Sequence, residues 1–122
     1  MSDSCILCLD TWVWSDATKS PYPRVGHAVT YLPAGHGGNP ATVKLYVFGG
    51  FSGDGFCKDL LAIDASGAAV GTPSTFSQLA TKGSPSMRFA HCVAALDGRL
   101  FVFGGSAAHD ELNDLCEIQL PE

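Results

Sequence analysis

Two seven-residue stretches of the sequence share one pattern, and they constrain the fold more than any other feature. Residues 44–50 read Lys-Leu-Tyr-Val-Phe-Gly-Gly, and residues 99–105 read Arg-Leu-Phe-Val-Phe-Gly-Gly. Four consecutive large apolar residues lack the alternation of a strand that faces water on one side, so we expect strands covered on both faces. A glycine pair is typical of the end of such an element. Either stretch alone indicates an ordinary buried strand, but the spacing of 55 residues (49 to 104) indicates a repeat.

The repeat extends beyond these stretches. Three further landmarks follow one another along the chain. They are an arginine with a histidine three positions later, an aspartate before a leucine, and an aromatic residue before a Gly/Pro turn. The first two landmarks occur twice, at Arg24 and His27, Arg88 and His91, Asp59 and Asp114. The copies differ in length because residues 33–40 form a loop that the second copy replaces with Asp97-Gly98, a signal for a tight hairpin. Residues 3–7 form a third, partial copy that resembles residues 59–63, with Trp12 or Trp14 answering Phe76.

One unit predicts four short antiparallel strands, here called A to D in chain order, and no segment shows helical periodicity. In the complete unit we expect strand A at 25–32 and strand B at the run that ends in Gly49-Gly50. Strand C follows Asp59, and strand D is expected at 75–80. Repeats of this length are typical of β-propellers, in which each four-stranded sheet is a blade covered by its neighbours. We therefore expect a partial blade at 1–17, a complete repeat at 18–81 and a partial repeat at 82–122.

These landmarks together resemble the kelch repeat, and the resemblance covers nearly the whole chain. It implies an all-β propeller with strand A lining the central channel and strand D outermost. It also implies a protein-interaction module, because kelch-like proteins mostly serve that role. Ala90 stands where the first copy has Gly26, and Phe76 stands where tryptophan is usual in the family.

The number of expected strands limits what the chain can form alone. The order C-D, A-B-C-D, A-B-C amounts to about two and a quarter blades, whereas a closed propeller needs at least about four. The count favours a fragment of a larger propeller, completed by further blades, over self-assembly into a ring.

Composition excludes several classes of function. A net charge of −5 gives no electrostatic footprint for nucleic acid or an anionic membrane. No apolar run approaches the ~18 residues of a membrane helix, and the N-terminus lacks the pattern of a signal peptide. Five cysteines and the absence of a glycosylation sequon favour a reduced, cytoplasmic setting. Cys5 and Cys8 form a Cys-x-x-Cys without a second pair, so we expect buried free thiols and no metal site.

We expect a protein partner at one rim of the propeller, where the B–C and D–A loops gather. Loops on a rigid scaffold carry function, and aromatic residues and arginine dominate interface hot spots. The residues expected to bind are Tyr22, Arg24, Phe51, Ser52, Asp54, Phe56, Arg88 and His109. For the two arginines a second role stays open, because a planar guanidinium can also tie down loop carbonyls. The opposite rim, with loops at 33–42 and 66–74, is chemically plain.

The remaining recurrent residues are expected to be structural. They are Gly49, Gly50, Gly104, Gly105, His27, His91, Asp59, Asp114, Trp12 and Trp14. No catalytic residue, cofactor or metal ligand is predicted, since neither a Walker loop nor a Gly-x-Ser-x-Gly elbow is present. Two alternatives stay open. One is the propeller of an enzyme, of galactose-oxidase type or like the iron-binding specifier proteins, whose Glu-x-x-x-Asp-x-x-x-His run is absent here. The other is a structural fragment without independent activity.

Overall fold

A computed structural model describes residues 5–16, 21–32, 44–64, 75–81 and 85–120. Within these ranges the chain forms eleven β-strands and no helix, and every pairing between strands is antiparallel. In the described part of the chain there is accordingly no helix long and apolar enough to span a membrane. The expectation of an all-β chain built from antiparallel sheets is confirmed.

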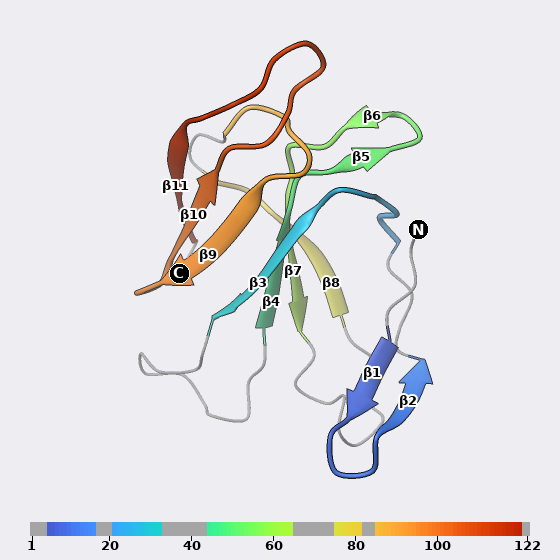
Figure 1. The fold of residues 1–122 in the computed structure, drawn as a ribbon. Helices are drawn as coiled ribbons and strands as arrows, with labels where there is room; N and C mark the ends of the chain where they lie inside the picture. Colours follow the sequence, from blue (N-terminus) through green and yellow to red (C-terminus); the bar gives the residue numbers. More distant parts are fainter. Residues whose placement is uncertain (1–4, 17–20, 33–43, 65–74, 82–84, 121–122) are drawn as a thin grey trace.

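The first two strands form an N-terminal hairpin. It contains β1 (Cys5–Cys8) and β2 (Val13–Asp16), which pair from Cys5 opposite Asp16 to Cys8 opposite Val13. In Figure 1 this hairpin lies at the lower right. The two strands form a sheet of their own, and the prediction that they are strands C and D of a partial blade stays a prediction.

The middle sheet has four strands in the order β3-β4-β7-β8. They are β3 (Ala28–Leu32), β4 (Lys44–Phe48), β7 (Leu60–Asp64) and β8 (Thr75–Leu79). The first of the two repeated stretches is β4, which lies between two neighbours and ends at the glycine pair. Between β4 and β7 the chain adds a short hairpin of β5 (Phe51–Ser52) and β6 (Gly55–Phe56), where the sequence predicts a turn.

The C-terminal sheet has three strands in the order β11-β10-β9. They are β9 (Cys92–Leu96), β10 (Arg99–Phe103) and β11 (Leu115–Gln119). The predicted tight turn between β9 and β10 is confirmed. Asp97 and Gly98 both have positive φ angles, 51° and 76°, as a hairpin turn of type I′ requires.

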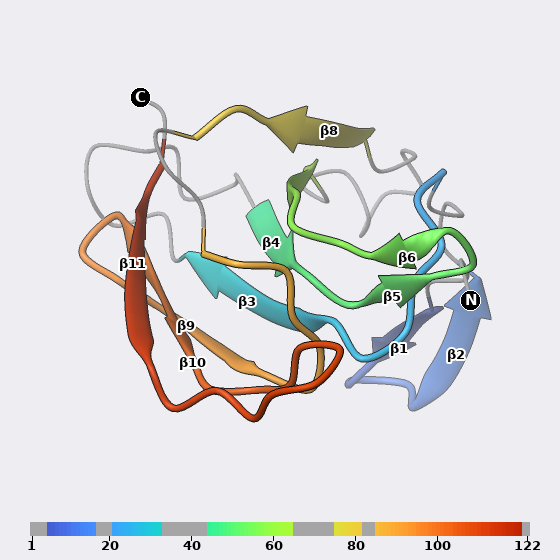
Figure 2. The same ribbon diagram turned by 90° about the horizontal axis from the view of Figure 1, so that it is seen from above.

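The hydrophobic core lies between the middle and C-terminal sheets. Tyr46, Phe48 and Leu60 of the middle sheet cluster with Leu100, Val102 and Ile118 of the C-terminal sheet, and all six are buried. Seen from above in Figure 2, the two sheets diverge from β3 and β9, their first strands, which lie side by side. This arrangement explains why the first repeated stretch lacks polar alternation: in β4 one face meets the next sheet while Val47, on the other face, is buried as well. In β10 only one face is covered, because Phe103 on the other face is exposed, so the expectation of two covered faces is wrong for the second stretch among the described residues.

The cysteines differ from expectation in burial. All five are free, but Cys5, Cys8 and Cys92 are exposed and the other two are partly buried. The expectation of buried thiols is therefore wrong. For Cys5 and Cys8 the reason is that they belong to a hairpin of only two strands.

Candidate functional site

The loops that join strands B to C and D to A lie at one end of the two sheets. In Figure 1 the β5–β6 hairpin, the segment between β10 and β11, and the chain leading into β3 and β9 all reach the upper end. We call the described residues 21–25, 51–59, 85–89 and 106–113 the loop rim. The loops expected at the opposite rim, 33–42 and 66–74, lie outside the described residues.

Backbone pairing connects the loops of each unit in the same way. Val25 and Phe51 exchange two backbone hydrogen bonds of 2.9 and 2.8 Å, and Phe89 and Ser106 exchange two of 3.0 and 2.9 Å. Each B–C loop is thus fixed to the segment that precedes strand A of its own unit.

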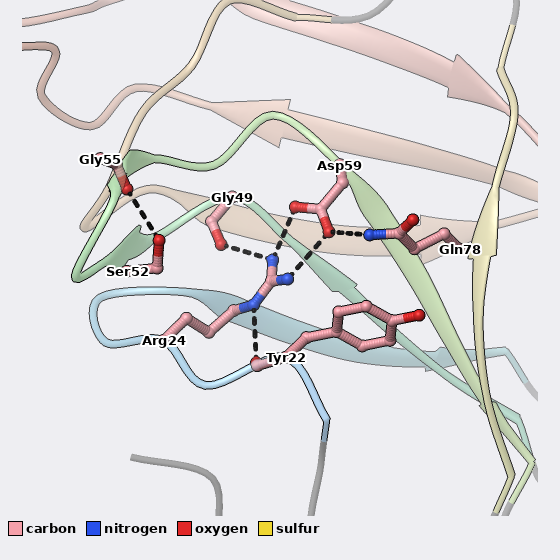
Figure 3. A network of polar contacts seen from close by, with 7 residues as sticks. All are labelled: Tyr22, Arg24, Gly49, Ser52, Gly55, Asp59 and Gln78. Atoms are coloured by element: carbon pink, nitrogen blue, oxygen red, sulfur yellow. Dashed lines mark hydrogen bonds and ion pairs between the residues drawn. The ribbon is translucent and has the colours of Figure 1, made fainter.

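Arg24 lies at the centre of the first unit's loops, as Figure 3 shows. Its Nη1 donates to the Gly49 carbonyl at 3.0 Å and to Asp59 Oδ1 at 2.9 Å, and its Nη2 donates to Asp59 Oδ2 at 2.8 Å. Gln78 of β8 donates to the same carboxylate at 3.3 Å. The guanidinium therefore joins the end of strand B to the start of strand C, and the side chain is only 6 % exposed.

Arg88 makes the same contacts in the second unit. It donates to the Gly104 carbonyl at 3.0 Å and to the two carboxylate oxygens of Asp114 at 2.7 and 2.9 Å, and it is fully buried. Bidentate pairs of this kind combine charge with fixed geometry, which is the case in which arginine cannot be replaced by lysine.

These contacts correct the expectation that Arg24 and Arg88 present their donors to a partner. The sequence left two roles open for these arginines. In the structure they have the second role, because each donates a hydrogen bond to a loop carbonyl. Burial alone would raise the pKa of the Asp59 carboxyl, but the hydrogen bonds and charge of Arg24 outweigh it and lower that pKa. The hydrogen bonds of Arg88 hold the pKa of Asp114 far below its usual value. Both carboxylates are therefore ionised at neutral pH.

A second set of contacts joins the two sheets near the rim. His91 Nε2 lies 2.7 Å from the Phe48 carbonyl oxygen, Gly50 N–H donates to the Arg88 carbonyl at 2.9 Å, and Ala90 N–H donates to the Gly26 carbonyl at 2.8 Å. Burial lowers the pKa of His91, and the hydrogen bond to Phe48 opposes this only in part. A neutral imidazole that donates from Nε2 leaves Nδ1 as an acceptor, and Nδ1 is buried with no partner among the described residues.

The glycine pairs have different surroundings in the two units. A Cβ on Gly49 would lie 2.6 Å from His91 Cε1 and 2.8 Å from the Arg88 carbonyl oxygen, so the neighbouring sheet requires glycine there. A Cβ on Gly104 would meet only the Leu112 carbonyl oxygen, at 3.3 Å. His27, the counterpart of His91, is exposed and has no hydrogen bond to any described residue. Of the predicted structural residues, Gly49, Gly50 and His91 thus make contacts between the two sheets.

Aromatic side chains form the most apolar part of the loop rim. Phe51 and Phe56 pack edge to face with ring centroids 5.5 Å apart, and Phe56 stacks on Phe89 at the same distance. Phe51 remains exposed over 42 % of its surface. Ser52 Oγ donates to the Gly55 carbonyl and accepts from the Asp54 N–H, which stabilises the tip of the hairpin.

A depression of about 400 Å³ opens beside this hairpin. It lies between the segment that precedes strand A and the B–C loop, and the Arg24–Asp59 pair is part of its wall. Its lining residues are Pro21, Tyr22, Pro23, Arg24, Ser52, Gly53, Asp54, Cys57, Lys58 and Asp59. The structure thus brings together four of the predicted binding residues, Tyr22, Arg24, Ser52 and Asp54.

Other predicted residues lie elsewhere. His109 is exposed on the loop between β10 and β11, in the second unit and outside this depression. Trp12 and Trp14 were expected to be structural, but their side chains are among the most exposed of the large hydrophobic residues that the structure describes. The reason is that β1 and β2 form a sheet of two strands, with no described strand paired on either side.

The arginine–aspartate pairs were not predicted as pairs, although all four residues were singled out. The separations, 24 to 59 and 88 to 114, are 35 and 26 residues. They differ by nine, the same as the difference in length between the two copies before strand B. That shared offset is the signal that would have linked each arginine to its aspartate. In the described part of the chain, no group of three or more His, Cys, Asp or Glu side chains is placed to hold a metal ion.

Comparison with known families gives one finding. Residues 1–121 match the model of the KLHDC2/KLHL20/DRC7 Kelch-repeats domain. The match covers all of the landmarks from which the repeat was inferred, and its extent includes the hairpin and both sheets.

Proposed function

The chain belongs to the kelch-repeat family, and from that premise we propose that its loop rim binds a protein partner beside the β5–β6 hairpin. Kelch-repeat domains are in general protein-interaction modules with a β-propeller fold, and the hairpin and sheets described here are blades or parts of blades. We further propose that the chain acts as part of a larger propeller, divided into units at 1–17, 18–81 and 82–122.

The depression beside the β5–β6 hairpin is the observation that carries the proposed site. The Arg24–Asp59 pair forms part of its wall and holds the loops around it in place before a partner arrives, which lowers the cost of binding. Tyr22 lines the depression, and Phe51, which precedes the lining residue Ser52, adds exposed aromatic surface. The backbone around Ser52 and Asp54 supplies polar groups. Aromatic anchors beside polar groups are typical of the energetic centre of an interface.

The test is a partner screen with the full chain and three single variants. Phe51→Ala and Asp54→Ala alter the proposed site, and Leu96→Ala is the matched control, an exposed apolar residue at the opposite end of the sheets. We expect at least one binder whose affinity falls about tenfold or more with Phe51→Ala, since hot-spot truncation costs about 2 kcal/mol or more. Leu96→Ala should leave that affinity unchanged. Binders that respond to neither Phe51 nor Asp54 contradict the assignment to this rim.

A further inference from the structure

One face of the C-terminal sheet is open, although its counterpart in the middle sheet is covered. Phe103 is 54 % exposed and Leu115 is 67 % exposed, whereas Phe48 and Leu60, 55 residues earlier, are 0 % and 3 % exposed. Phe103 and Leu115 are directly paired across β10 and β11, as Phe48 and Leu60 are across β4 and β7. The C-terminal sheet itself covers the earlier pair, and no described segment covers the later one.

The middle sheet has the matching open surface on its other face. Val29 is 49 % exposed and Tyr31 is 56 % exposed on β3. Their counterparts 64 residues later, Val93 and Ala95 on β9, pack against the core between the sheets. His27 precedes this surface and is exposed, whereas His91 hydrogen-bonds to the preceding sheet.

We propose that these two open surfaces bind each other, so that a second copy of this chain docks head to tail on the first. The inference rests on the proposed function in one respect: it names a second copy as the source of the next blade. The Val29 and Tyr31 face of one copy packs on Phe103 and Leu115 of the other, in the arrangement by which β9–β11 pack on the middle sheet. Because the two surfaces differ, the contact is heterologous, and a pair of copies keeps one free surface of each kind, one on each copy.

The polar groups of the internal junction have counterparts at this contact. Within the chain, Gly50 N–H donates to the Arg88 carbonyl and His91 Nε2 bonds to the Phe48 carbonyl. At the new junction the equivalent bonds would join the Gly105 N–H of one copy to the Arg24 carbonyl of the next copy. They would also join the Phe103 carbonyl of the first copy to the His27 ring of the next. Among the described residues, the Gly105 N–H and the His27 ring have no hydrogen-bond partner, so both are available for these bonds.

Two features differ from the internal junction. Glu117 stands where the middle sheet has Ala62, but Arg99 lies 3.4 Å from its carboxylate, so its charge is paired. The N-terminal hairpin is the predicted copy of strands C and D. It would therefore occupy the same position next to the middle sheet as β11 of the docking copy. A two-stranded hairpin is marginally stable by itself, and we expect β11 to displace it.

The experiment measures molar mass by light scattering over a wide range of concentrations, with the full chain. The chain should exceed its monomer mass of 12.8 kDa as concentration rises. Leu115→Asp and Val29→Asp should each weaken association at least about tenfold, since each buries a carboxylate in an apolar contact. Leu9→Asp is the matched control, because Leu9 is 69 % exposed on the turn of the hairpin that β11 is expected to displace, so this substitution should not weaken association.

Mixing the two weakened variants gives the decisive result. Leu115→Asp retains an intact Val29 surface and Val29→Asp retains an intact Leu115 surface, so a mixture should form one-to-one dimers that stop at twice the monomer mass. Circular dichroism shows whether each variant keeps its strands.

Three outcomes overturn the inference: a chain that stays at monomer mass throughout, association that neither substitution weakens, or weakened variants that do not rescue each other. A monomeric chain that still binds a partner through Phe51 overturns the inference and leaves the proposed function standing. If the chain associates but no binder responds to Phe51→Ala, the inference stands and the proposed function is contradicted.

Discussion

The middle sheet and the C-terminal sheet come from the same repeat, yet equivalent residues have opposite surroundings. Phe48 and Leu60 lie in the core, whereas Phe103 and Leu115 face outward. Gly49 is packed against His91, whereas Gly104 has space beside it. By contrast, the Arg24–Asp59 and Arg88–Asp114 pairs have the same geometry in both sheets. Contacts made within a sheet therefore repeat with the sequence, and contacts made between sheets depend on whether a neighbour is present.

The largest expected effect separates the two phenylalanines. Phe48→Ala should lower the free energy of unfolding by about 3–5 kcal/mol, because it leaves a cavity between the sheets. Phe103→Ala should change it by less than about 0.5 kcal/mol in dilute solution, where the exposed face is not in contact with another chain. Urea denaturation followed by circular dichroism measures both. Equal losses would mean that the outer face of β10 is covered, which would remove the contrast between the sheets.

The glycine pair tests the junction more locally. Gly49 and Gly104 have nearly the same φ, 70° and 67°, so alanine at either position costs about 1–2 kcal/mol for the left-handed backbone. Gly49→Ala should cost about 1–3 kcal/mol more, because its methyl group overlaps His91 and the Arg88 carbonyl. The difference between the two variants in the same denaturation experiment isolates the contact between sheets. A difference near zero would show that His91 can move aside without cost.

The ion pairs test what the two sheets share. Asp59→Asn leaves the Arg24 charge buried without its partner and should cost about 1–3 kcal/mol. Glu117→Gln removes the partner of Arg99 in a pair that is largely exposed, so we expect only about 0–1 kcal/mol. Thermal unfolding of both variants against the original chain gives the comparison. A larger loss for Glu117→Gln would mean that the exposed pair lies in an interface.

The smallest expected effect is a dependence on pH between 7 and 5. Burial lowers the pKa of His91, so below about pH 6.5 the unfolded chain binds the proton more readily than the folded one. The free energy of unfolding should therefore fall as pH falls, while Asp59 and Asp114, with lowered pKa values, lose their contributions only in more acidic solution. His91→Gln should reduce this slope when urea denaturation is repeated at each pH, and His27, whose pKa is lowered by partial burial and by the charge of Arg24, accounts for part of what remains.

His27→Gln is the matched variant for this experiment. His27 has no hydrogen bond to a described residue, so its replacement should leave stability at pH 7 unchanged, whereas His91→Gln should lower it by removing the bond to Phe48. Equal effects of the two substitutions at pH 7 would contradict the assignment of His91 to the junction.

Much of the fold follows from local patterns. The run of apolar residues before each glycine pair predicted β4 and β10, and Asp97-Gly98 predicted the turn between β9 and β10, because backbone requirements there involve near neighbours in sequence. The strand of the Trp14 region was also expected, but its exposure was not, since burial needs a partner sheet. For the candidate site, the sequence indicated the B–C loop and Tyr22, and it left the role of Arg24 open. The residues next to Arg24 in the sequence do not determine which oxygen atoms surround its guanidinium.

What the sequence alone determined is the repeat: a kelch-type unit of four antiparallel strands, whose landmarks recur in one order and whose glycine pair ends strand B. What the tertiary structure decided is which copy of each landmark is buried. Hydrogen bonds within a unit, such as those from Arg24 to the Gly49 carbonyl and the Asp59 carboxylate, form wherever the unit folds. Burial of Phe48 and bonding by His91 require a second sheet at the correct distance, and for Phe103 and His27 no described part of the chain provides that sheet.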